Sequence, residues 1–324
     1  MAEYKYNSKL QFVKPNCKGN LLNNHGQFTN GLGLDSKFSL SKLLKWKLST
    51  VDYKNGRNDE DYNLKVVKDS SFLNTDDDVI VWLGHATVYI RIDGVSIITD
   101  PIFADMPMVK RRADFPINPN DIRNLNYVLL SHAHRDHFDK KSIKILQSNN
   151  PQMEVLTPLN IGKWLQRKHI KYQEAAWWQK YDTKSKIEIN LLPAMHWNMR
   201  IIMDYNKGLW GSFVIKIGGK SIFFAGDTAY GLHFNEIGEL FPNIDYCLMP
   251  IGAYQPQYMM KQSHMSPWEA ITAFKDIKGK TMIPMHYGTF QLANEYFGEP
   301  EELMRKSASD VNIKIMAAGE NFNI

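Results

Sequence analysis

The segment YVLLSHAHRDHFD, residues 127–139, joins a short apolar run to a dense group of polar side chains. YVLLS has the length and apolar content of a buried strand, and four potential metal ligands follow it directly: His132, His134, Asp136 and His137. Imidazole and carboxylate groups together suit Zn, Fe or Mn, and a turn between a strand and a helix can direct them towards two neighbouring ions. The complete His-x-His-x-Asp-His pattern therefore predicts a metal site, which a single His-x-His pair would not.

Three further candidate ligands follow later apolar runs of the chain. His196 comes after INLLPA, Asp227 after IFFAG and His286 after TMIPM. In α/β proteins, ligands collect where strands meet their following loops, because the loops converge while the sheet holds them rigidly. These seven positions together predict a site for two metal ions.

The pattern of apolar and polar residues changes near Asp78, where short apolar runs begin to alternate with helical stretches. Strands are predicted at 79–84, 87–92, 95–100, 127–131, 154–158, 187–194, 213–218, 221–226, 246–252 and 281–285. Helices are predicted at about 139–148, 159–168, 233–240, 266–277 and 299–307. This order is typical of an α/β fold in which helices pack outside the sheets.

Residues 1 to about 75 lack this dense pattern and are rich in Asn, Lys, Ser and Asp. We therefore expect an N-terminal extension or lid over residues 1–75 and a catalytic domain over residues 76–324. Leucines near helical spacing around Trp46 predict a short amphipathic helix within the extension. Such a helix could dock onto the catalytic domain, line an acyl pocket or touch a membrane.

Composition and charge restrict the class of protein. The two cysteines, Cys17 and Cys247, form no CxxC pair and are too few for a disulfide framework, so a reducing cytosol is the simplest expectation. No signal peptide and no run of 18 apolar residues is visible, although attachment to a membrane surface stays open. The formal net charge of +5 is spread along the chain, so no nucleic-acid partner is expected.

The ligand motifs carry a family resemblance. HAHRDH with His196, Asp227 and His286 resembles the metallo-β-lactamase superfamily, which implies an αββα sandwich of two mixed β-sheets with helices on the outer faces. The resemblance also implies how the ligands divide: one ion is held by His132, His134 and His196, the other by Asp136, His137 and His286, and Asp227 bridges the two. We expect two divalent ions, with Zn²⁺ the first choice and Fe or Mn as alternatives.

A narrower resemblance runs over roughly residues 37–295. WLGHATVYIRIDG, TDPIF, LWGSF, FFAGDTAY, PIGAYQP and MHYGTFQLANE together resemble N-acyl-phosphatidylethanolamine-hydrolysing phospholipase D and its bacterial relatives. This implies a phosphodiesterase in which the ions lower the pKa of a shared water, so that hydroxide attacks phosphorus in line. It places His264 near the phosphate, with His264 or Lys261 as a stabilising cation, and adds Tyr254 as a substrate contact. Asp136, Asp227 and His264 are the candidate catalytic residues.

Several nearby residues have two interpretations. Asp100, which closes VSIITD, could orient a ligand histidine through its second ring nitrogen or cap the following TDP turn. His85 lies within a strand-like run, which favours a hydrogen-bonded core histidine over a residue supporting the site. Trp197 beside His196 could line a substrate pocket or pack in the core. The remaining histidines are expected at the surface or in packing roles, namely His25, His169 and His233.

Alternative functions share the same metal chemistry. A lactonase or carboxylic-ester hydrolase would use the same hydroxide on carbon, where a tetrahedral oxyanion forms. A nuclease is disfavoured because no concentrated basic segment is visible. A non-catalytic metal protein is the remaining class, although a di-iron electron-transfer protein would normally need a flavin domain that this length hardly accommodates. A small molecule or a phospholipid is the expected substrate, and a homodimer stays open.

Overall fold

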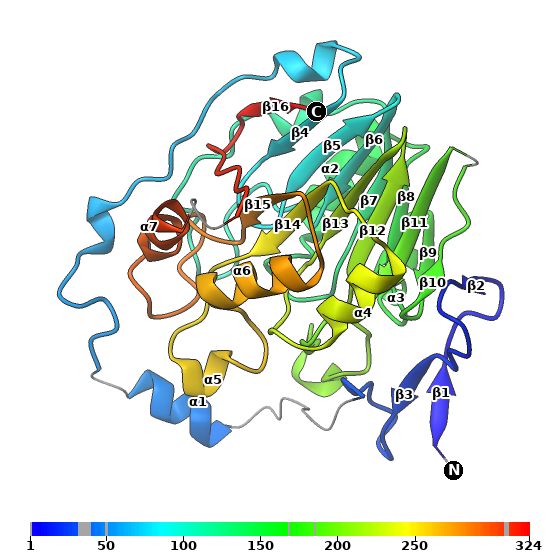
Figure 1. The fold of residues 1–324 in the computed structure, drawn as a ribbon, viewed down its shortest axis with the longest axis horizontal. Coiled ribbons are helices and arrows are strands. Elements are labelled where there is room, and N and C mark those ends of the chain that lie inside the picture. Colours follow the sequence, from blue (N-terminus) through cyan, green and yellow to red (C-terminus); the bar gives the residue numbers. More distant parts are fainter. Residues whose placement is uncertain (1, 32–39, 49–50, 168, 185, 308–310) are drawn as a thin grey trace.

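The computed structural model describes residues 2–31, 40–48, 51–167, 169–184, 186–307 and 311–324. Within these residues, two seven-stranded mixed sheets pack against each other, and helices cover their outer faces (Figure 1). The predicted αββα sandwich is therefore confirmed. The first sheet has the order β16 (Asn321–Asn323), β4 (Val79–Trp82), β5 (Val88–Ile92), β6 (Val95–Thr99), β7 (Leu125–Leu129), β8 (Glu154–Pro158) and β9 (Tyr172–Ala175).

The second sheet combines strands from the C-terminal half of the chain with β2 from the N-terminal segment. Its order is β15 (Thr281–Met285), β14 (Tyr246–Pro250), β13 (Lys220–Phe224), β12 (Ser212–Ile217), β11 (Ile187–Leu192), β10 (Gln179–Lys180) and β2 (Gln11–Phe12). A separate antiparallel pair joins β1 (Glu3–Lys5) to β3 (Asn20–Leu22). The ten strands predicted from apolar runs are all present, whereas β1, β2, β3, β9, β10 and β16 were not predicted because they are short and less apolar.

The helices are short, and local side chains cap the starts of α2 and α6. They are α1 (Leu40–Lys47), α2 (Lys140–Asn149), α3 (Lys163–Gln166), α4 (His233–Leu240), α5 (Gln257–Met260), α6 (Pro267–Asp276) and α7 (Glu299–Lys306), with 3-10 turns at 59–61, 71–74, 119–121 and 202–204. Asp139 begins α2 by accepting hydrogen bonds from the amides of Lys141 and Ser142. Ser266 and Glu269 form a capping box at the start of α6.

Both faces of the first sheet are buried at β4, β5 and β6, which explains why these strands are mainly apolar. Ile80 and Trp82 of β4 join the core between the two sheets, whereas Val79 and Val81 face the opposite side. That outer face is covered by α2, whose Ile143 belongs to the same cluster as Val79. The alternation follows the two-residue period of a strand, so each strand contributes to two apolar layers.

Strand direction brings the candidate ligands to one edge of the sandwich. β6 is parallel to β7, and β13, β14 and β15 are mutually parallel. β11 runs in the same direction as β13 because each is antiparallel to β12. The carboxyl ends of parallel strands meet at one edge, so the residues that follow them lie close together.

The N-terminal segment packs against the rest of the chain through several contacts. β2 pairs with β10, and the Phe28 side chain is buried in the core between the sheets. In α1, the Trp46 indole donates to Asn294 Oδ1 at 3.0 Å, and the Lys45 ammonium lies over the Tyr258 ring. These contacts attach α1 to the segments that carry Tyr258 and Asn294.

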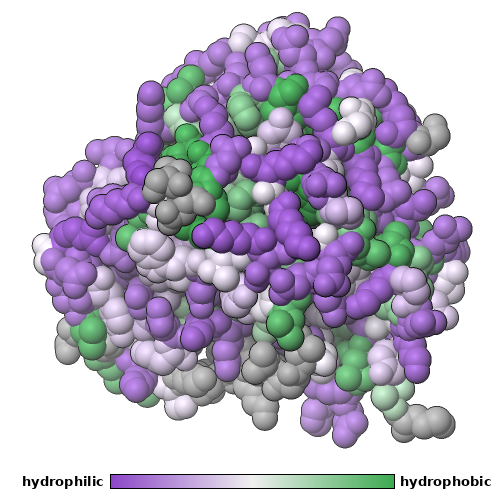
Figure 2. Space-filling view, viewed as in Figure 1, coloured by the Kyte–Doolittle hydropathy of each residue, from purple (hydrophilic) through white to green (hydrophobic). Residues whose placement is uncertain are grey.

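The surface in Figure 2 is mostly hydrophilic, with hydrophobic side chains in small scattered patches. None of the helices in the described part of the chain combines the length and the apolar content that crossing a bilayer requires. The large apolar side chains instead fill the interior, with Trp82, Trp210 and Tyr89 among the largest that are fully buried. The apolar content of the chain is therefore used mainly in the sandwich core.

His233 is buried at the start of α4, and its burial predicts a pH-dependent stability. Burial lowers the pKa of His233 to about 3 from an ordinary value of 6.5. Between these pH values the unfolded chain binds a proton that the folded chain does not, so the free energy of unfolding falls as the pH drops below about 6.5. We expect His233→Gln to reduce the loss of stability between pH 7 and pH 5 by about 2 kcal/mol.

Urea unfolding of both proteins at the two pH values measures this difference. Gln is chosen because its amide can replace the contact between His233 Nε2 and Thr228 Oγ1, which is 3.2 Å long. All other titrating groups are common to both proteins and cancel in the comparison. An unchanged pH dependence in the variant would show that His233 does not titrate as its burial implies.

Candidate metal centre

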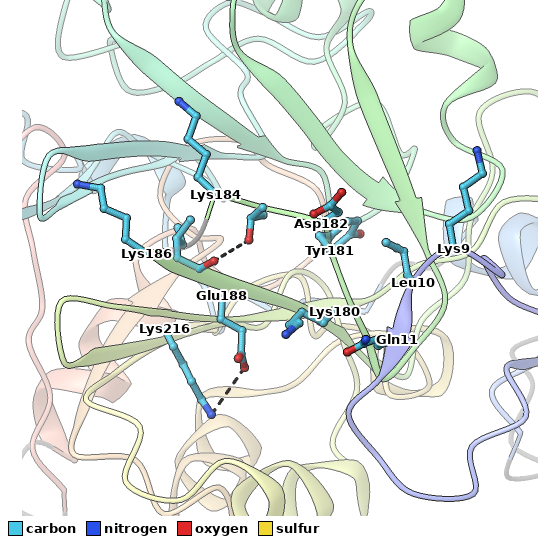
Figure 3. Close-up of a pocket in the computed structure, with 12 residues that line it drawn as sticks. Lys9, Leu10, Gln11, Lys180, Tyr181, Asp182, Lys184, Lys186, Glu188 and Lys216 are labelled. Carbon is cyan, nitrogen blue, oxygen red and sulfur yellow. Dashed lines mark hydrogen bonds and ion pairs between the residues drawn. The ribbon is translucent and has the colours of Figure 1, made fainter.

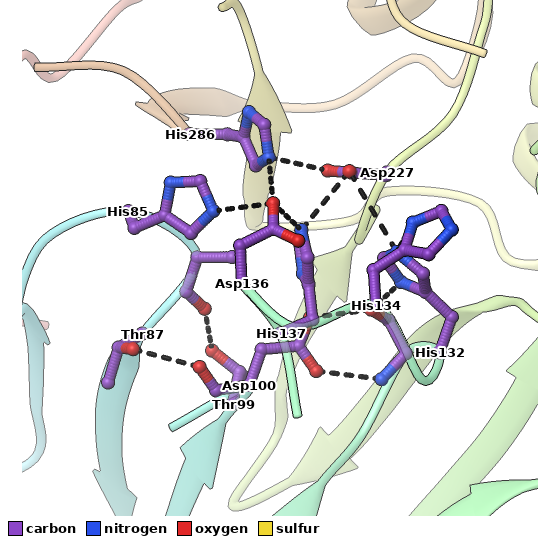
Figure 4. Close-up of polar contacts among 12 residues, drawn as sticks. His85, Thr87, Thr99, Asp100, His132, His134, Asp136, His137, Asp227 and His286 are labelled. Carbon is purple, nitrogen blue, oxygen red and sulfur yellow. Dashed lines mark hydrogen bonds and ion pairs between the residues drawn. The ribbon is translucent and has the colours of Figure 1, made fainter. Parts of the chain in front are cut away.

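Three histidines from two segments form the first group of ligand atoms. His132 Nε2 lies 2.8 Å from His134 Nδ1 (Figure 4). His134 Nδ1 in turn lies 3.2 Å from His196 Nε2. Ligands at about 2.1 Å from a tetrahedral zinc ion are roughly 3.4 Å apart. The three nitrogen atoms therefore have a spacing that one ion could satisfy, with His134 presenting Nδ1 and the other two presenting Nε2.

A second group lies beside the first and includes Asp136, His137 and His286. Asp136 Oδ2 lies 3.4 Å from His137 Nε2 and 3.7 Å from His286 Nε2. His85 joins this group, since its Nε2 is 3.2 Å from the same carboxylate oxygen. These four ligand atoms all lie within 4.8 Å of one another.

Asp227 lies between the two groups. Its Oδ2 is 3.8 Å from His196 Nε2 and 3.1 Å from His137 Nε2, while its Oδ1 is 3.1 Å from His286 Nε2. One carboxylate thus reaches both sets of nitrogen atoms. Its position is suited to a bridging ligand.

The donor set also fits metal ions because several of its atoms lack hydrogen-bond partners. Among the described residues, His137 Nε2, His286 Nε2 and Asp227 Oδ1 are buried without one. Leaving such a polar group unsatisfied in the interior costs about 1–3 kcal/mol. A cation at the centre of the cluster would satisfy all three atoms, and imidazole with carboxylate suits Zn, Fe and Mn.

The model of the protein family described as "Beta-lactamase superfamily domain" matches residues 96–287 of this chain. This match covers more than half of the chain and contains all seven predicted ligands. The chain belongs to the metallo-β-lactamase superfamily. The family match, the relatives and the ligand cluster together identify it as a metal-dependent hydrolase of that superfamily.

Curated relatives place the chain in the N-acyl-phosphatidylethanolamine phospholipase D-like branch of the superfamily. N-acyl-phosphatidylethanolamine-hydrolyzing phospholipase D 1 of Caenorhabditis elegans is 30% identical over 315 residues, which cover 91% of this chain and 88% of the relative. The mitochondrial N-acyl-phosphatidylethanolamine-hydrolyzing phospholipase D of Saccharomyces cerevisiae is 32% identical over 239 residues, which cover 70% of this chain. That match spans about half of the yeast relative, 51% of its length.

A solved structure supports the fold independently. A metallo hydrolase from the archaeon Ignicoccus hospitalis has a TM-score of 0.59 and 23% sequence identity, and it covers 76% of this chain and 98% of its own. At this level of identity the similarity concerns the metallo-β-lactamase fold alone.

Neighbouring groups orient two of the candidate ligand histidines in this metallo-β-lactamase member. Asp100 Oδ2 lies 2.7 Å from His137 Nδ1, and the Asp100 carboxylate also accepts hydrogen bonds from the amide and hydroxyl of Ser131. His196 Nδ1 lies 2.9 Å from the Ser263 carbonyl oxygen, to which it can donate. Ligating imidazoles usually donate their second N–H in this way, so of the two interpretations of Asp100 the geometry matches the orienting one.

The charges within the cluster are strongly coupled. Burial would raise the pKa of Asp227, but the neighbouring charges of His137 and His286 hold it well below its usual value. Burial opposes protonation of His286, yet Asp227 and Asp136 raise its pKa to about 9. Burial lowers the pKa of His134 to about 4. Without metal, protons on His137 and His286 therefore balance the carboxylates, and divalent cations would replace those protons.

His85 differs from its predicted location. It lies in the turn between β4 and β5, not inside a strand, and has a backbone φ of +53°. Its amide donates to Thr289 Oγ1 at 2.8 Å, and its carbonyl accepts from the amide of His286 at 2.9 Å. The strand interpretation was wrong because WLGHATVYI is apolar on both sides of the turn. The turn directs the buried imidazole towards Asp136.

The three predicted substrate contacts occupy different places. His264 Nδ1 lies 3.9 Å from Asp227 Oδ2, so His264 adjoins the metal cluster. The Trp197 ring packs edge-on against His134 at 4.3 Å between centroids and is only partly buried. Tyr254 is buried, and its hydroxyl donates to Glu299 in α7. The structure thus brings His264 and Trp197 to the ligands, whereas the described contacts of the Tyr254 hydroxyl are with α7.

Two asparagines that were not singled out from the sequence support the ligand segments. Asn198 Oδ1 accepts a hydrogen bond from the Ala133 amide at 2.8 Å, inside the HAHRDH motif. The Asn30 side chain accepts from the His196 amide at 3.3 Å and donates to the His196 carbonyl at 3.1 Å. Asn198 is near His196 in sequence, which is a weak signal. Asn30 is 166 positions away from His196, so no local pattern could reveal it.

Proposed function

We propose that the chain is a binuclear phosphodiesterase that cleaves an N-acylated phospholipid or a closely similar phosphodiester. The observation that carries this proposal is the extent of the match to the Caenorhabditis elegans phospholipase D, which covers 91% of this chain. That match extends well beyond residues 96–287, the part shared with the wider superfamily. The resemblance therefore includes more than the metal-binding framework.

The ligand geometry supports two metal ions. One would be held by His132, His134 and His196 and the other by Asp136, His137 and His286, with Asp227 between them. Two such ions, when bound, lower the pKa of a coordinated water and stabilise negative charge on the attacking and leaving oxygens. No Ser or Cys nucleophile is needed for this chemistry.

The side chains around the ligands have separate tasks in this proposal. Asp100 holds His137 in one orientation and keeps its Nε2 directed at the cluster. The Ser263 carbonyl does the same for His196. Trp197 provides a partly exposed aromatic wall beside His134, where the apolar part of a lipid could lie. Together they pre-organise the site before substrate arrives.

His264 acts as a neutral hydrogen-bonding group in this proposal. Burial lowers its pKa to about 4, so the imidazole is uncharged near pH 7. The sequence-based expectation that His264 serves as a cation is therefore revised. The neutral ring can still donate one hydrogen bond to a phosphate oxygen, and the exposed Lys261 lies three residues before it.

A substrate panel tests the proposal. Metal-loaded protein should hydrolyse N-acyl-phosphatidylethanolamine and bis-p-nitrophenyl phosphate, and it should leave a panel of lactones unchanged. Water adds a hydroxyl group to phosphorus while the bond to the ethanolamine oxygen breaks, so the lipid products are phosphatidate and an N-acylethanolamine. Mass spectrometry of the two products identifies which bond was cut.

The His134→Ala variant is the control for this panel, because it removes one ligand nitrogen from the first group. We expect it to lose phosphodiester hydrolysis by about a hundredfold or more. Turnover of lactones alone by the metal-loaded wild-type protein would overturn the phosphodiesterase and favour a lactonase of the same fold.

A further inference from the structure

Two loops beside the HAHRDH segment expose large apolar side chains to solvent. Met108 is 103% exposed, and Ile202 and Met203 are 86% and 81% exposed. Isolated exposed apolar residues are common, but a group beside a catalytic site is informative. We call Met108, Ile201, Ile202 and Met203 the apolar rim.

Met108 occupies a backbone position that does not favour a large side chain. Met106 and Val109 exchange two backbone hydrogen bonds, of 3.0 Å and 3.2 Å, which close a tight turn with Pro107 and Met108 at its tip. Met108 has a φ of +66°, a conformation for which Gly or Asn is preferred in such turns. A Met at this position has an unfavourable backbone conformation, and its exposed side chain contributes nothing to the core. Both features suggest that Met108 contacts something outside the chain.

The second loop is held firmly in place by polar contacts. The Asp204 carboxylate accepts hydrogen bonds from the amides of Arg200 and Ile201, at 2.8 Å and 3.0 Å. The Arg200 guanidinium in turn donates to the carbonyls of Ala133, within the HAHRDH segment, and of Phe138, directly after it. The exposed tip at 201–203 is therefore anchored directly to the metal-binding segment.

The two loops frame one hollow of about 420 Å³, and its lining is basic. It is lined by Asp105, Met106, Pro107, Arg135, Asp139, Lys140, Lys141 and Arg200. Its four cations, Arg135, Lys140, Lys141 and Arg200, outnumber its two carboxylates, Asp105 and Asp139, which accept hydrogen bonds from backbone amides and keep their negative charge. The hollow therefore has a net positive charge of two, and the apolar rim follows its lining residues Pro107 and Arg200 in sequence.

We propose that the apolar rim and this basic hollow form a docking surface for an anionic phospholipid membrane. The rim side chains would enter the boundary between headgroups and acyl chains, while the cations would meet lipid phosphates. The proposal extends the proposed function, on which it rests for the choice of lipid as substrate. Arg135 belongs to the HAHRDH motif, so docking would place the membrane directly beside the ligand cluster.

A second basic surface of the chain offers a matched control. A groove of about 450 Å³ is lined by Lys9, Leu10, Gln11, Lys180, Tyr181, Asp182, Thr183, Lys184, Lys186, Ile187, Glu188 and Lys216 (Figure 3). It lies at the end of β11 and β12 where Glu188 pairs with Lys216, and His196 follows the opposite end of β11. None of the exposed apolar rim residues lines it, so the groove has positive charge without apolar tips.

The experiment measures binding to vesicles made of two parts phosphatidylcholine and one part phosphatidylserine. The triple variant Met108→Asn, Ile202→Ser, Met203→Ser should bind at least about tenfold more weakly than the wild type. Asn tolerates the positive φ of residue 108, so this change should not disturb the turn. Hydrolysis of water-soluble bis-p-nitrophenyl phosphate should be unchanged within about twofold.

Charge is tested by two double variants that remove the same number of lysines. Lys141→Gln in the basic hollow, combined with Lys110→Gln at the exposed lysine two residues after Met108, should weaken vesicle binding by about tenfold. Lys9→Gln with Lys184→Gln, in the lysine groove, should leave it unchanged. Equal weakening by both pairs would show that binding is a general effect of net charge and would overturn the docking surface.

The outcomes separate this proposal from the proposed function. Tight vesicle binding that depends on the rim, without any phosphodiester hydrolysis, would support the docking surface and contradict the phosphodiesterase. Hydrolysis of bis-p-nitrophenyl phosphate by a triple variant that binds vesicles as tightly as the wild type would leave the phosphodiesterase intact and overturn the docking surface. Failure of the wild type to bind anionic vesicles would overturn it as well.

Discussion

Replacing Asp227 by Asn is expected to lower the proposed phosphodiester hydrolysis by about a thousandfold or more and to reduce the bound metal from the proposed two ions to about one per chain. The Asp227 carboxylate is buried and reaches nitrogen atoms of both ligand groups, at 3.1 Å for His286 and 3.8 Å for His196. Asn keeps the shape but removes the negative charge that would neutralise and bridge two cations. Steady-state kinetics and elemental analysis of the purified variant measure the two effects.

Asp139→Asn is the matched control for this prediction, because it makes the same chemical change within the same site region. The Asp139 side chain caps α2 and is not among the ligand groups, and Asn serves equally well as a helix cap. Its activity and metal content should remain close to those of the wild type. An Asp227→Asn protein that retains two ions and full activity would exclude Asp227 as the bridging ligand.

The gathering of the candidate ligands was largely predictable from the sequence because each segment that carries them follows an apolar strand. The apolar runs before His132, His196, Asp227 and His286 are long enough to be recognised as strands. Because these strands run in the same direction, their carboxyl ends meet at one edge of the sandwich. Local pattern and global topology agree at these positions. The same agreement made the αββα sandwich predictable.

The contacts outside the candidate ligand set were much harder to predict, since the residues that form them are distant in sequence. β2 is two residues long and pairs with β10 across about half of the chain, a contact that periodicity cannot reveal. His85 was assigned to a strand because apolar residues flank it, and only its positive φ marks the turn. The hydroxyl of Tyr254 donates to Glu299, which depends on where α7 packs.

The turn at His85 also connects the core to the metal centre. Trp82 is fully buried, stacks on Tyr287 at 4.8 Å between ring centroids, and donates its indole N–H to the His85 carbonyl at 2.8 Å. That same carbonyl accepts from the amide of His286. One core side chain therefore supports both the turn that carries His85 and the strand end that carries His286.

Trp82→Ala should consequently lower the free energy of unfolding by about 3–5 kcal/mol, through loss of buried surface and the cavity left behind. Trp82→Phe is the matched variant, since it keeps an aromatic ring against Tyr287 but loses the indole donor. It should cost only about 1–2 kcal/mol, yet weaken metal binding several-fold, because the His85 carbonyl loses one of its two donors. Urea unfolding and metal titration separate the two effects. If Trp82→Phe bound metal like the wild type, the indole hydrogen bond would matter for packing and not for the metal centre.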